Sequence, residues 1–314
     1  MTIPDSPDAL SLAFRAVGFV LLLNAAGIPI FLALFSRGSF GLSLDCAIAI
    51  TRIGWKLAIA ALLFVAGHYV LEAARMAGEM SGMLDPAMQS MALHSSQGAA
   101  FIVRIAGLAL IAGSLRSVGQ AAVSDVRAVS ASVSAGLGAS AARIGLLGSV
   151  LATASFTLTG HTSVTPHRPA AAVLLTLHLL VVAFWMGSLW PLYLMASAER
   201  HADAARLIEA FSRIAAWLVP IIFVAGLGLT ALLVPGLSTF EQPYGQLLLA
   251  KVATFAVLMA LATLNKWRFG PACEAGDTRA FKRTVVFEYV LICLVLAITA
   301  TMTMFYSPDS PEVP

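Results

Sequence analysis

Long apolar stretches separated by short polar segments dominate the chain. These stretches repeatedly reach the ~20 residues that a helix needs to cross the hydrocarbon core of a bilayer. A membrane β-barrel would instead show segments of ~10 residues with alternating character, and no such pattern is visible. The pattern predicts eight membrane-spanning helices, at residues 11–35, 44–75, 96–115, 142–161, 171–196, 211–234, 245–265 and 284–305.

We therefore expect an all-α fold, a polytopic membrane helix bundle that forms one integral membrane domain over residues 1–314. Asp5 and Asp8 precede the first apolar run in place of a basic segment, so we expect that run to be retained rather than removed as a signal peptide. The stretch 117–142 is rich in Ala, Ser, Val and Gly, which is compatible with either a loop or an interfacial helix.

Composition supports the membrane assignment and excludes other classes. The chain is 59% hydrophobic and only 11% charged, whereas soluble domains carry roughly 25% charged residues. The net charge of +3 gives no argument for nucleic-acid binding, because the basic residues lie between the apolar stretches. Cys46, Cys273 and Cys293 are scattered without a CxxC pair, so neither a disulfide framework nor a zinc site is expected.

Lysine and arginine gather after the first, third, fifth and seventh predicted helices. The segments after the even-numbered helices contain Arg168 and little else. Because basic residues concentrate on the cytoplasmic side, the odd-numbered segments should be cytoplasmic and both termini periplasmic. The residues that carry this expectation are Arg37, Arg116, Arg127, Arg200, Arg206, Lys266, Arg268, Arg279, Lys282 and Arg283.

Five of the eleven methionines fall in the outer segment between the second and third helices, and a histidine follows them. Thioether and imidazole groups together suit Cu(I) far better than Mg²⁺, Ca²⁺ or Mn²⁺. Methionine also packs well in apolar cores, but five of them in a short segment containing Glu79 and Asp85 are hard to explain as core. A helical extension would align the first three on one face. These candidate metal ligands are Met76, Met80, Met83, Met88, Met91 and His94.

Three further histidines should lie near the outer ends of helices. His178 is inside the fifth predicted helix, His161 ends the fourth, and His68 lies near the outer end of the second. A histidine inside a span is costly and usually functional, so we take all three as candidate metal ligands. The alternatives are an interhelical hydrogen bond for His178 and a solvated interfacial ring for His161. Glu72, four residues after His68, could orient the His68 ring.

Other polar residues favour structural roles. Positive charge on Arg104 and Lys251 would oppose a passing cation, and Glu72 is a plausible partner for Arg104. Few soft ligands lie in the inner half of the predicted bundle, so no complete path for a metal ion is visible there. Those few are Cys46, Met186, Met195 and Met259.

The chain resembles the CopD family of bacterial copper-resistance membrane proteins over nearly its whole length, most strongly over residues 171–305. Ser188 stands where the family pattern has a second glycine. The patterns that carry the resemblance are Leu84-Asp85-Pro86, Gln97-Gly98, Arg104, Gly160-His161, His178, Trp185-x-Gly187-x-Leu189, Phe211-Ser212-Arg213-x-Ala215, Tyr244-Gly245-x-x-Leu248-x-x-Lys251 and Asn265-x-x-Arg268.

The resemblance implies a non-enzymatic inner-membrane protein that moves copper, which we expect as Cu(I), from the periplasm toward the cytoplasm. It also implies a periplasmic CopC-like copper-binding partner, and only about ten residues precede the first predicted helix, too few for such a domain. No GxxxxGK[ST] motif is present, so nucleotide-driven transport is not expected.

Two other functions remain open at this point. Buried histidines on facing helices could ligate haem in a b-type electron-transfer protein, although a second, inner pair is missing. A copper sensor or assembly partner that does not transport would carry the same outer ligands.

Overall fold

The computed structural model describes residues 6–36, 42–124, 139–198 and 201–306. Within these ranges the chain is helical and contains no strand, and eight helices are long and apolar enough to cross a membrane. The predicted helical membrane bundle is confirmed. The α-helices are α1 (Ser6–Phe35), α2 (Leu44–Ala77), α3 (Pro86–Leu93), α4 (Ser96–Ser124), α6 (Ala139–Ala154), α7 (Arg168–Ala198), α8 (His201–Leu233), α9 (Pro243–Leu264), α10 (Gly270–Glu274) and α11 (Arg279–Phe305).

Short tight helices connect several of these elements. The 3₁₀ turns are η1 (Met80–Leu84), η2 (Ser155–Leu158), η3 (His161–Ser163) and η4 (Leu237–Glu241). A π-helical segment, η5 (Asn265–Phe269), continues α9 into α10. The helix α3 was not predicted from the sequence, because eight residues are too few to give a clear apolar period.

Two predicted boundaries are wrong in an informative way. The fourth spanning helix ends at Ala154 rather than at 161, and the chain then passes through η2 to an extended Thr159. The sixth spanning helix begins at His201 rather than at 211. Its first ten residues are amphipathic and bury Leu207 and Ile208 against the rest of the bundle, which extends the helix beyond the apolar run.

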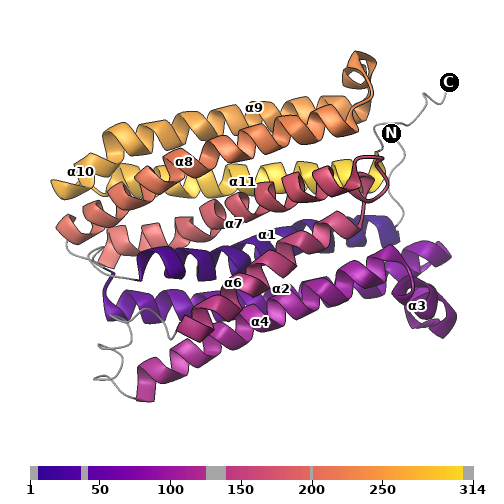
Figure 1. Ribbon diagram of the computed structural model, residues 1–314, viewed down its shortest axis with the longest axis horizontal. Helices are drawn as coiled ribbons and strands as arrows, with labels where there is room; N and C mark the ends of the chain where they lie inside the picture. Colours follow the sequence, from indigo (N-terminus) through magenta and orange to yellow (C-terminus); the bar gives the residue numbers. More distant parts are fainter. Residues whose placement is uncertain (1–5, 37–41, 125–138, 199–200, 307–314) are drawn as a thin grey trace.

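Helix α1 lies at the centre of the bundle. Along its length Leu22, Ala25, Ile28, Phe31 and Leu32 are at most 1% exposed. It packs against α2, α7, α6 and α11, so it joins the N-terminal helices to the C-terminal ones. In Figure 1 the indigo α1 runs between α2 and α7 across the middle of the molecule.

The contact between α1 and α7 depends on two glycines. A Cβ atom added to Gly27 would lie 1.9 Å from the carbonyl oxygen of Ala183, and one added to Gly187 would lie 2.5 Å from the Cα of Gly27. The two backbones therefore touch directly. Small residues of this kind let membrane helices approach closely, where packing rather than the hydrophobic effect holds helices together.

Helices α8 and α9 occupy the periphery of the C-terminal half. Helix α8 packs mainly against α7, and α9 packs mainly against α11, so few close backbone contacts join α8 to α9. Both carry large apolar side chains on their outer faces, including Trp217, Val224, Val252 and Val257, as expected for helices facing lipid. The C-terminal half is thus a four-helix arrangement in which α8 and α9 are held mainly by α7 and α11.

We call the end of the bundle where α1 begins the outer end, and the opposite end the inner end. Helix α1 begins and α11 ends at the same end of the bundle, and α3 lies at that end too (Figure 1). Among the residues used to predict orientation, Arg116, Arg206 and Lys282 lie at the opposite end of their helices. Arg37, Arg127 and Arg200 lie outside the described residues. That the α3 end faces the periplasm remains a prediction.

Replacing Gly27 by Ala should destabilise the protein, because the added methyl meets backbone atoms that have no room to move. Overpacking of this kind costs about 1–3 kcal/mol. The matched control is Gly113→Ala on α4, where a Cβ meets nothing within 4 Å, and which gains up to about 1 kcal/mol of helix propensity. Thermal unfolding of the purified proteins in detergent measures both. Equal melting temperatures for the two variants would contradict the tight α1–α7 contact.

A phosphatase fused after Tyr306 should be active in intact bacteria, since that enzyme works only outside the cytoplasm and the positive-inside rule places this end there. The matched fusion joins the phosphatase to a chain that stops after Glu274, at the end of α10. It should be inactive because that point lies at the opposite end of the bundle. The reverse pattern of activities would overturn the sidedness of every site described below.

Candidate functional site

The methionine segment lies outside the bundle, at the end where α1 begins. Gly78, with a left-handed φ of 74°, ends α2 just after Met76, so the helical extension considered from the sequence does not form. Met80 and Met83 instead lie in η1, where residues three apart share a face. Met76, Met80 and Met91 are exposed, and Met83 and Met88 are half-buried.

Local sequence explains why α3 forms here. Asp85 caps the helix by accepting a hydrogen bond from the backbone N–H of Ala87 at 2.8 Å, and Pro86 occupies the first helical turn. Both choices are typical of a helix start. The hydroxyl of Tyr69 donates to the carbonyl of Gln89 at 3.3 Å, which ties α3 to α2. The Leu84-Asp85-Pro86 pattern is therefore a helix-start signal.

His94, which follows the methionines, has one ring nitrogen held by a hydrogen bond and the other available for a ligand. His94 ends α3, and its Nδ1 lies 2.8 Å from the carbonyl oxygen of Ser90. Because a carbonyl can only accept, Nδ1 carries the proton and the lone pair of Nε2 stays free. His94 and Met91 are exposed and three residues apart on the helix, so they lie on one face.

His68 lies in a different environment, among basic residues of the N-terminal helices. Its Nδ1 is 3.2 Å from the hydroxyl of Ser11 on α1. His68, Arg15 and Arg104 line one small cavity of about 10 Å³, enough for about one water molecule. The charges of both arginines act on the ring. A cation at His68 would therefore meet electrostatic repulsion.

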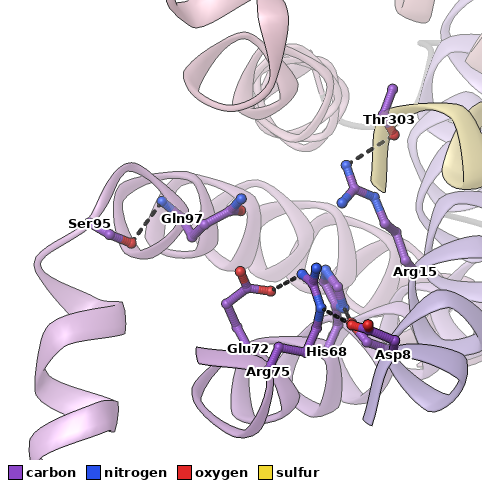
Figure 2. A network of polar contacts seen from close by, with 9 residues as sticks. Asp8, Arg15, His68, Glu72, Arg75, Ser95, Gln97 and Thr303 are labelled. Atoms are coloured by element: carbon purple, nitrogen blue, oxygen red, sulfur yellow. Dashed lines mark hydrogen bonds and ion pairs between the residues drawn. The ribbon is translucent and has the colours of Figure 1, made fainter. Parts of the chain in front are cut away.

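The carboxylates near His68 belong to Arg75. Its Nη1 lies 3.0 Å from Glu72, and its Nε lies 2.9 Å from Asp8 on α1, as Figure 2 shows. The expectation that Glu72 orients His68 or pairs with Arg104 is wrong. Arg104 instead donates to the hydroxyl of Ser155 at 3.0 Å and stacks over Phe156.

Arg15 completes this outer layer by joining the two ends of the chain. Its Nη2 donates to the hydroxyl of Thr303 on α11 at 3.1 Å (Figure 2). Its buried Nε has no hydrogen-bond partner among the described residues. The polar contacts at the outer ends of α1, α2, α4 and α11 thus fasten one helix to another.

His161 lies between the C-terminal helices at the outer surface. It follows Gly160 and sits in η3, not at the end of a spanning helix. Its Nε2 is 3.3 Å from the carbonyl oxygen of Tyr306, and its ring meets Tyr244 edge-on at 6.0 Å between centroids. The carbonyl again fixes the proton, this time on Nε2, and leaves Nδ1 free.

His178 is half-buried in the membrane region between α7 and α8. Its Nδ1 lies 3.0 Å from the carbonyl oxygen of Ile222 on α8. The carbonyl fixes the proton on Nδ1, so Nε2 presents a free lone pair, which is the arrangement found in metal-ligating histidines. The charge of Lys251 on α9 also acts on this ring. A cation at His178 would therefore meet repulsion from one basic residue, whereas three basic residues act on His68.

The candidate histidines do not form one cluster with each other or with carboxylates. In the part of the chain that the structure describes, no group of three or more His, Cys, Asp or Glu is placed to hold a metal ion. His68 packs against α1, His178 against α8, and His161 against Tyr244 and Tyr306. Their role as ligands remains a prediction.

A second feature of the C-terminal half was missed from the sequence. Glu288 on α11 is 3% exposed, deep in an apolar helix. Its carboxylate accepts hydrogen bonds from Trp185 Nε1 at 3.2 Å and from the side-chain amide of Asn265 at 2.5 Å. The sequence does contain a sign of this residue's importance, because an acidic residue inside an apolar run is rare and usually functional.

Glu288 borders a cavity of about 280 Å³ in the inner half of the bundle. The cavity lies between α7, α8, α9 with η5, and α11. Its lining is mostly apolar and also includes Ser212, Thr263, Asn265, Lys266 and Glu288, with Trp185 and Met259 among the larger side chains. Trp185 and Asn265 both belong to the patterns that carry the family resemblance.

Comparison with known proteins agrees with this location. The family model CopD, copper resistance protein D, matches residues 205–302. The C-terminal half of the chain is therefore similar to CopD copper-resistance proteins. The matched segment runs from α8 to near the end of α11 and includes Asn265 and Glu288. No curated protein and no solved structure matches the chain. The match and the eight long apolar helices together indicate a multi-pass membrane protein of copper resistance.

Proposed function

We propose that this protein moves copper, as Cu(I), across the bacterial inner membrane from the periplasm toward the cytoplasm. The similarity to CopD proteins supports copper handling; direction, oxidation state and ligands are part of the proposal. The ion is first held by the exposed methionine segment, from Met76 to Met91, together with His94. It then enters the C-terminal half at His178.

The geometry of His178 is the single observation that carries this proposal. A histidine in a membrane helix needs a reason to be there. The ring is held by the carbonyl of Ile222 through Nδ1, so its free Nε2 is already oriented for a ligand. A neutral imidazole accepts Cu(I) by ligand exchange from a thioether, which avoids a bare ion in an apolar medium.

The other two histidines have different places in the proposal. His161, beside Tyr244 and Tyr306 at the outer surface, is suited to pass the ion from the methionine segment to His178. His68 is a poorer ligand, because Arg15 and Arg104 line the same cavity. Of the three, we therefore assign His68 the smallest part in copper binding.

The exposed methionine segment also suits delivery by another protein. Met80, Met91 and His94 are accessible at the end of the bundle that we assign to the periplasm. A small periplasmic copper-binding protein of the CopC type could hand Cu(I) to these side chains by exchange of thioether ligands. We propose such a protein as the donor.

Replacing Met76, Met80, Met83, Met88 and Met91 together by Leu should lower copper uptake several-fold at low external copper. Leucine keeps the apolar volume and the helix propensity but cannot ligate a metal. Uptake of radioactive copper into right-side-out vesicles under reducing conditions measures the effect. The control replaces the buried Met186 and Met195 by Leu, which should leave uptake unchanged. Equal uptake by all three proteins would return the outer methionines to a packing role.

His178→Ala should abolish copper uptake at normal expression, whereas His167→Ala should change it little. His167 is exposed just before α7 begins and serves as the control. Uptake by His178→Ala equal to that of the parent would refute the proposed path. A parent protein that binds copper but takes up none would be a sensor or assembly partner, and a haem absorption band in the purified protein would indicate electron transfer instead.

A further inference from the structure

The inner cavity lies below His178, between the same two helices, α7 and α8. Trp185 follows His178 by seven residues on α7, two helical turns or about 10 Å deeper, on nearly the same face. On α8 the cavity-lining residues Val219 and Pro220 lie just below Ile222, the partner of His178. The cavity is therefore the next open space that an ion would meet below His178 on its way inward.

The charge of Glu288 is not balanced by any neighbour that the structure describes. Its hydrogen bonds come from two neutral groups, Trp185 and Asn265. No Lys, Arg or His of the described ranges forms an ion pair with it. An unpaired charge is expensive to bury, so Glu288 is either protonated and neutral or, when ionised, is stabilised by a cation that arrives from elsewhere.

The hydrogen bonds hold the Glu288 carboxylate in place and leave some of its acceptor positions available for a ligand. A carboxylate has about four acceptor positions, and the two donors occupy one on each oxygen. Thr284 donates to the side-chain oxygen of Asn265, which orients the amide so that its nitrogen faces Glu288. Asn265 begins the π-helical segment, and such segments are frequent at functional sites.

Other groups in the cavity wall agree with a soft cation. Met259 supplies a thioether and Ser212 a hydroxyl. Lys266 and Trp267 also border the cavity, both side chains are exposed, and the Lys266 ammonium lies 5.1 Å from the Trp267 ring centroid. Long basic side chains at membrane interfaces can direct their charge toward water.

We propose that this cavity is an inner cation site, in which the Glu288 carboxylate and the Met259 thioether bind a soft monovalent metal ion. The identity of the ion as copper rests on the proposed function, but the site itself does not. Glu288 neutralises the ion where the surroundings are apolar, Met259 supplies the soft ligand, and Trp185 and Asn265 hold the carboxylate in place.

The test uses Ag(I), a redox-inert soft monovalent ion, and the full-length protein purified in detergent. The background variant carries Leu at Met76, Met80, Met83, Met88 and Met91 and Ala at His68, His94, His161 and His178, so that the outer ligands proposed here are removed. Equilibrium dialysis should find Ag(I) bound in this background. Adding Glu288→Gln should weaken that binding at least ten-fold, and adding Met259→Leu should weaken it several-fold.

Matched controls change the same chemistry elsewhere. Glu209→Gln removes an exposed carboxylate that pairs with Arg213 on the surface of α8, and Met195→Leu removes a fully buried thioether that does not border the cavity. Both should leave Ag(I) binding unchanged. Bound Ag(I) should also quench tryptophan fluorescence, and the quenching should be reduced in Trp185→Phe, a result that a merely structural role for Glu288 would not give.

The outcomes separate this inference from the proposed function. Folded Glu288→Gln and Met259→Leu proteins that bind Ag(I) like their background would overturn the inner site, even if the parent transports copper. If Glu288→Gln does not fold, Met259→Leu decides alone, and unchanged affinity overturns the proposal. Ag(I) binding that depends on Glu288 in a protein without copper uptake would leave the inner site standing and refute the transport function.

Discussion

The direct contact between the backbones of α1 and α7 is the constraint on which the rest of the bundle depends. Gly27 and Gly187 allow an approach that no side chain larger than hydrogen permits. Because α1 is the central helix, this contact fixes how the C-terminal helices sit on the N-terminal ones. It also fixes the rotation of α7, since one face is committed to α1. His178 and Trp185 then project toward α8 and α11.

The two halves of the protein satisfy their buried polar groups in different ways. In the N-terminal half, Arg75 pairs with Asp8 and Glu72, and Arg104 pairs with Ser155 and the Phe156 ring. These contacts fasten helices together and leave a cavity with room for about one water molecule. In the C-terminal half, His178 keeps a free ring nitrogen, and Glu288 has only neutral hydrogen-bond partners among the described residues. The CopD match covers much of this second half, which agrees with placing the chemistry there.

The sequence predicted correctly those features that depend only on the order of residues along the chain. Apolar length located all eight spanning helices, and the clustering of methionines located a segment that the structure leaves exposed. It failed where the answer depends on which helix faces which. Glu72 is four residues from His68, yet it pairs with Arg75, because Asp8 on α1 draws Arg75 to that side.

In the inner half of the bundle, too, the sequence does not show which side chains face one another. A search for soft ligands found Cys46, Met186, Met195 and Met259 but could not rank them, because burial in a packed core and exposure to a cavity look identical in sequence. The structure separates them: Met186 and Met195 are fully buried, while Met259 borders the cavity. Glu288 was not among the predicted ligands, which were sulfur and imidazole groups. One carboxylate inside an apolar helix is nevertheless a strong sign of a functional residue.

The order of the ligands along the proposed path follows from the medium around them. At the exposed methionine segment, water and counterions screen the charge of Cu(I), so neutral thioethers are enough to hold it. At His178 the ring is half-buried, and a stronger neutral donor replaces part of the lost hydration. Within the inner cavity the lining is mostly apolar, and a neutral ligand alone would leave the positive charge of the ion without a counter-charge. A carboxylate is needed at that depth, and Glu288 lies there, held by Trp185 and Asn265 and without a basic partner among the described residues. The increase in ligand charge with depth is what electrostatics requires of a path for a monovalent cation, and it explains why the least expected residue in the apolar sequence of α11 is an acid.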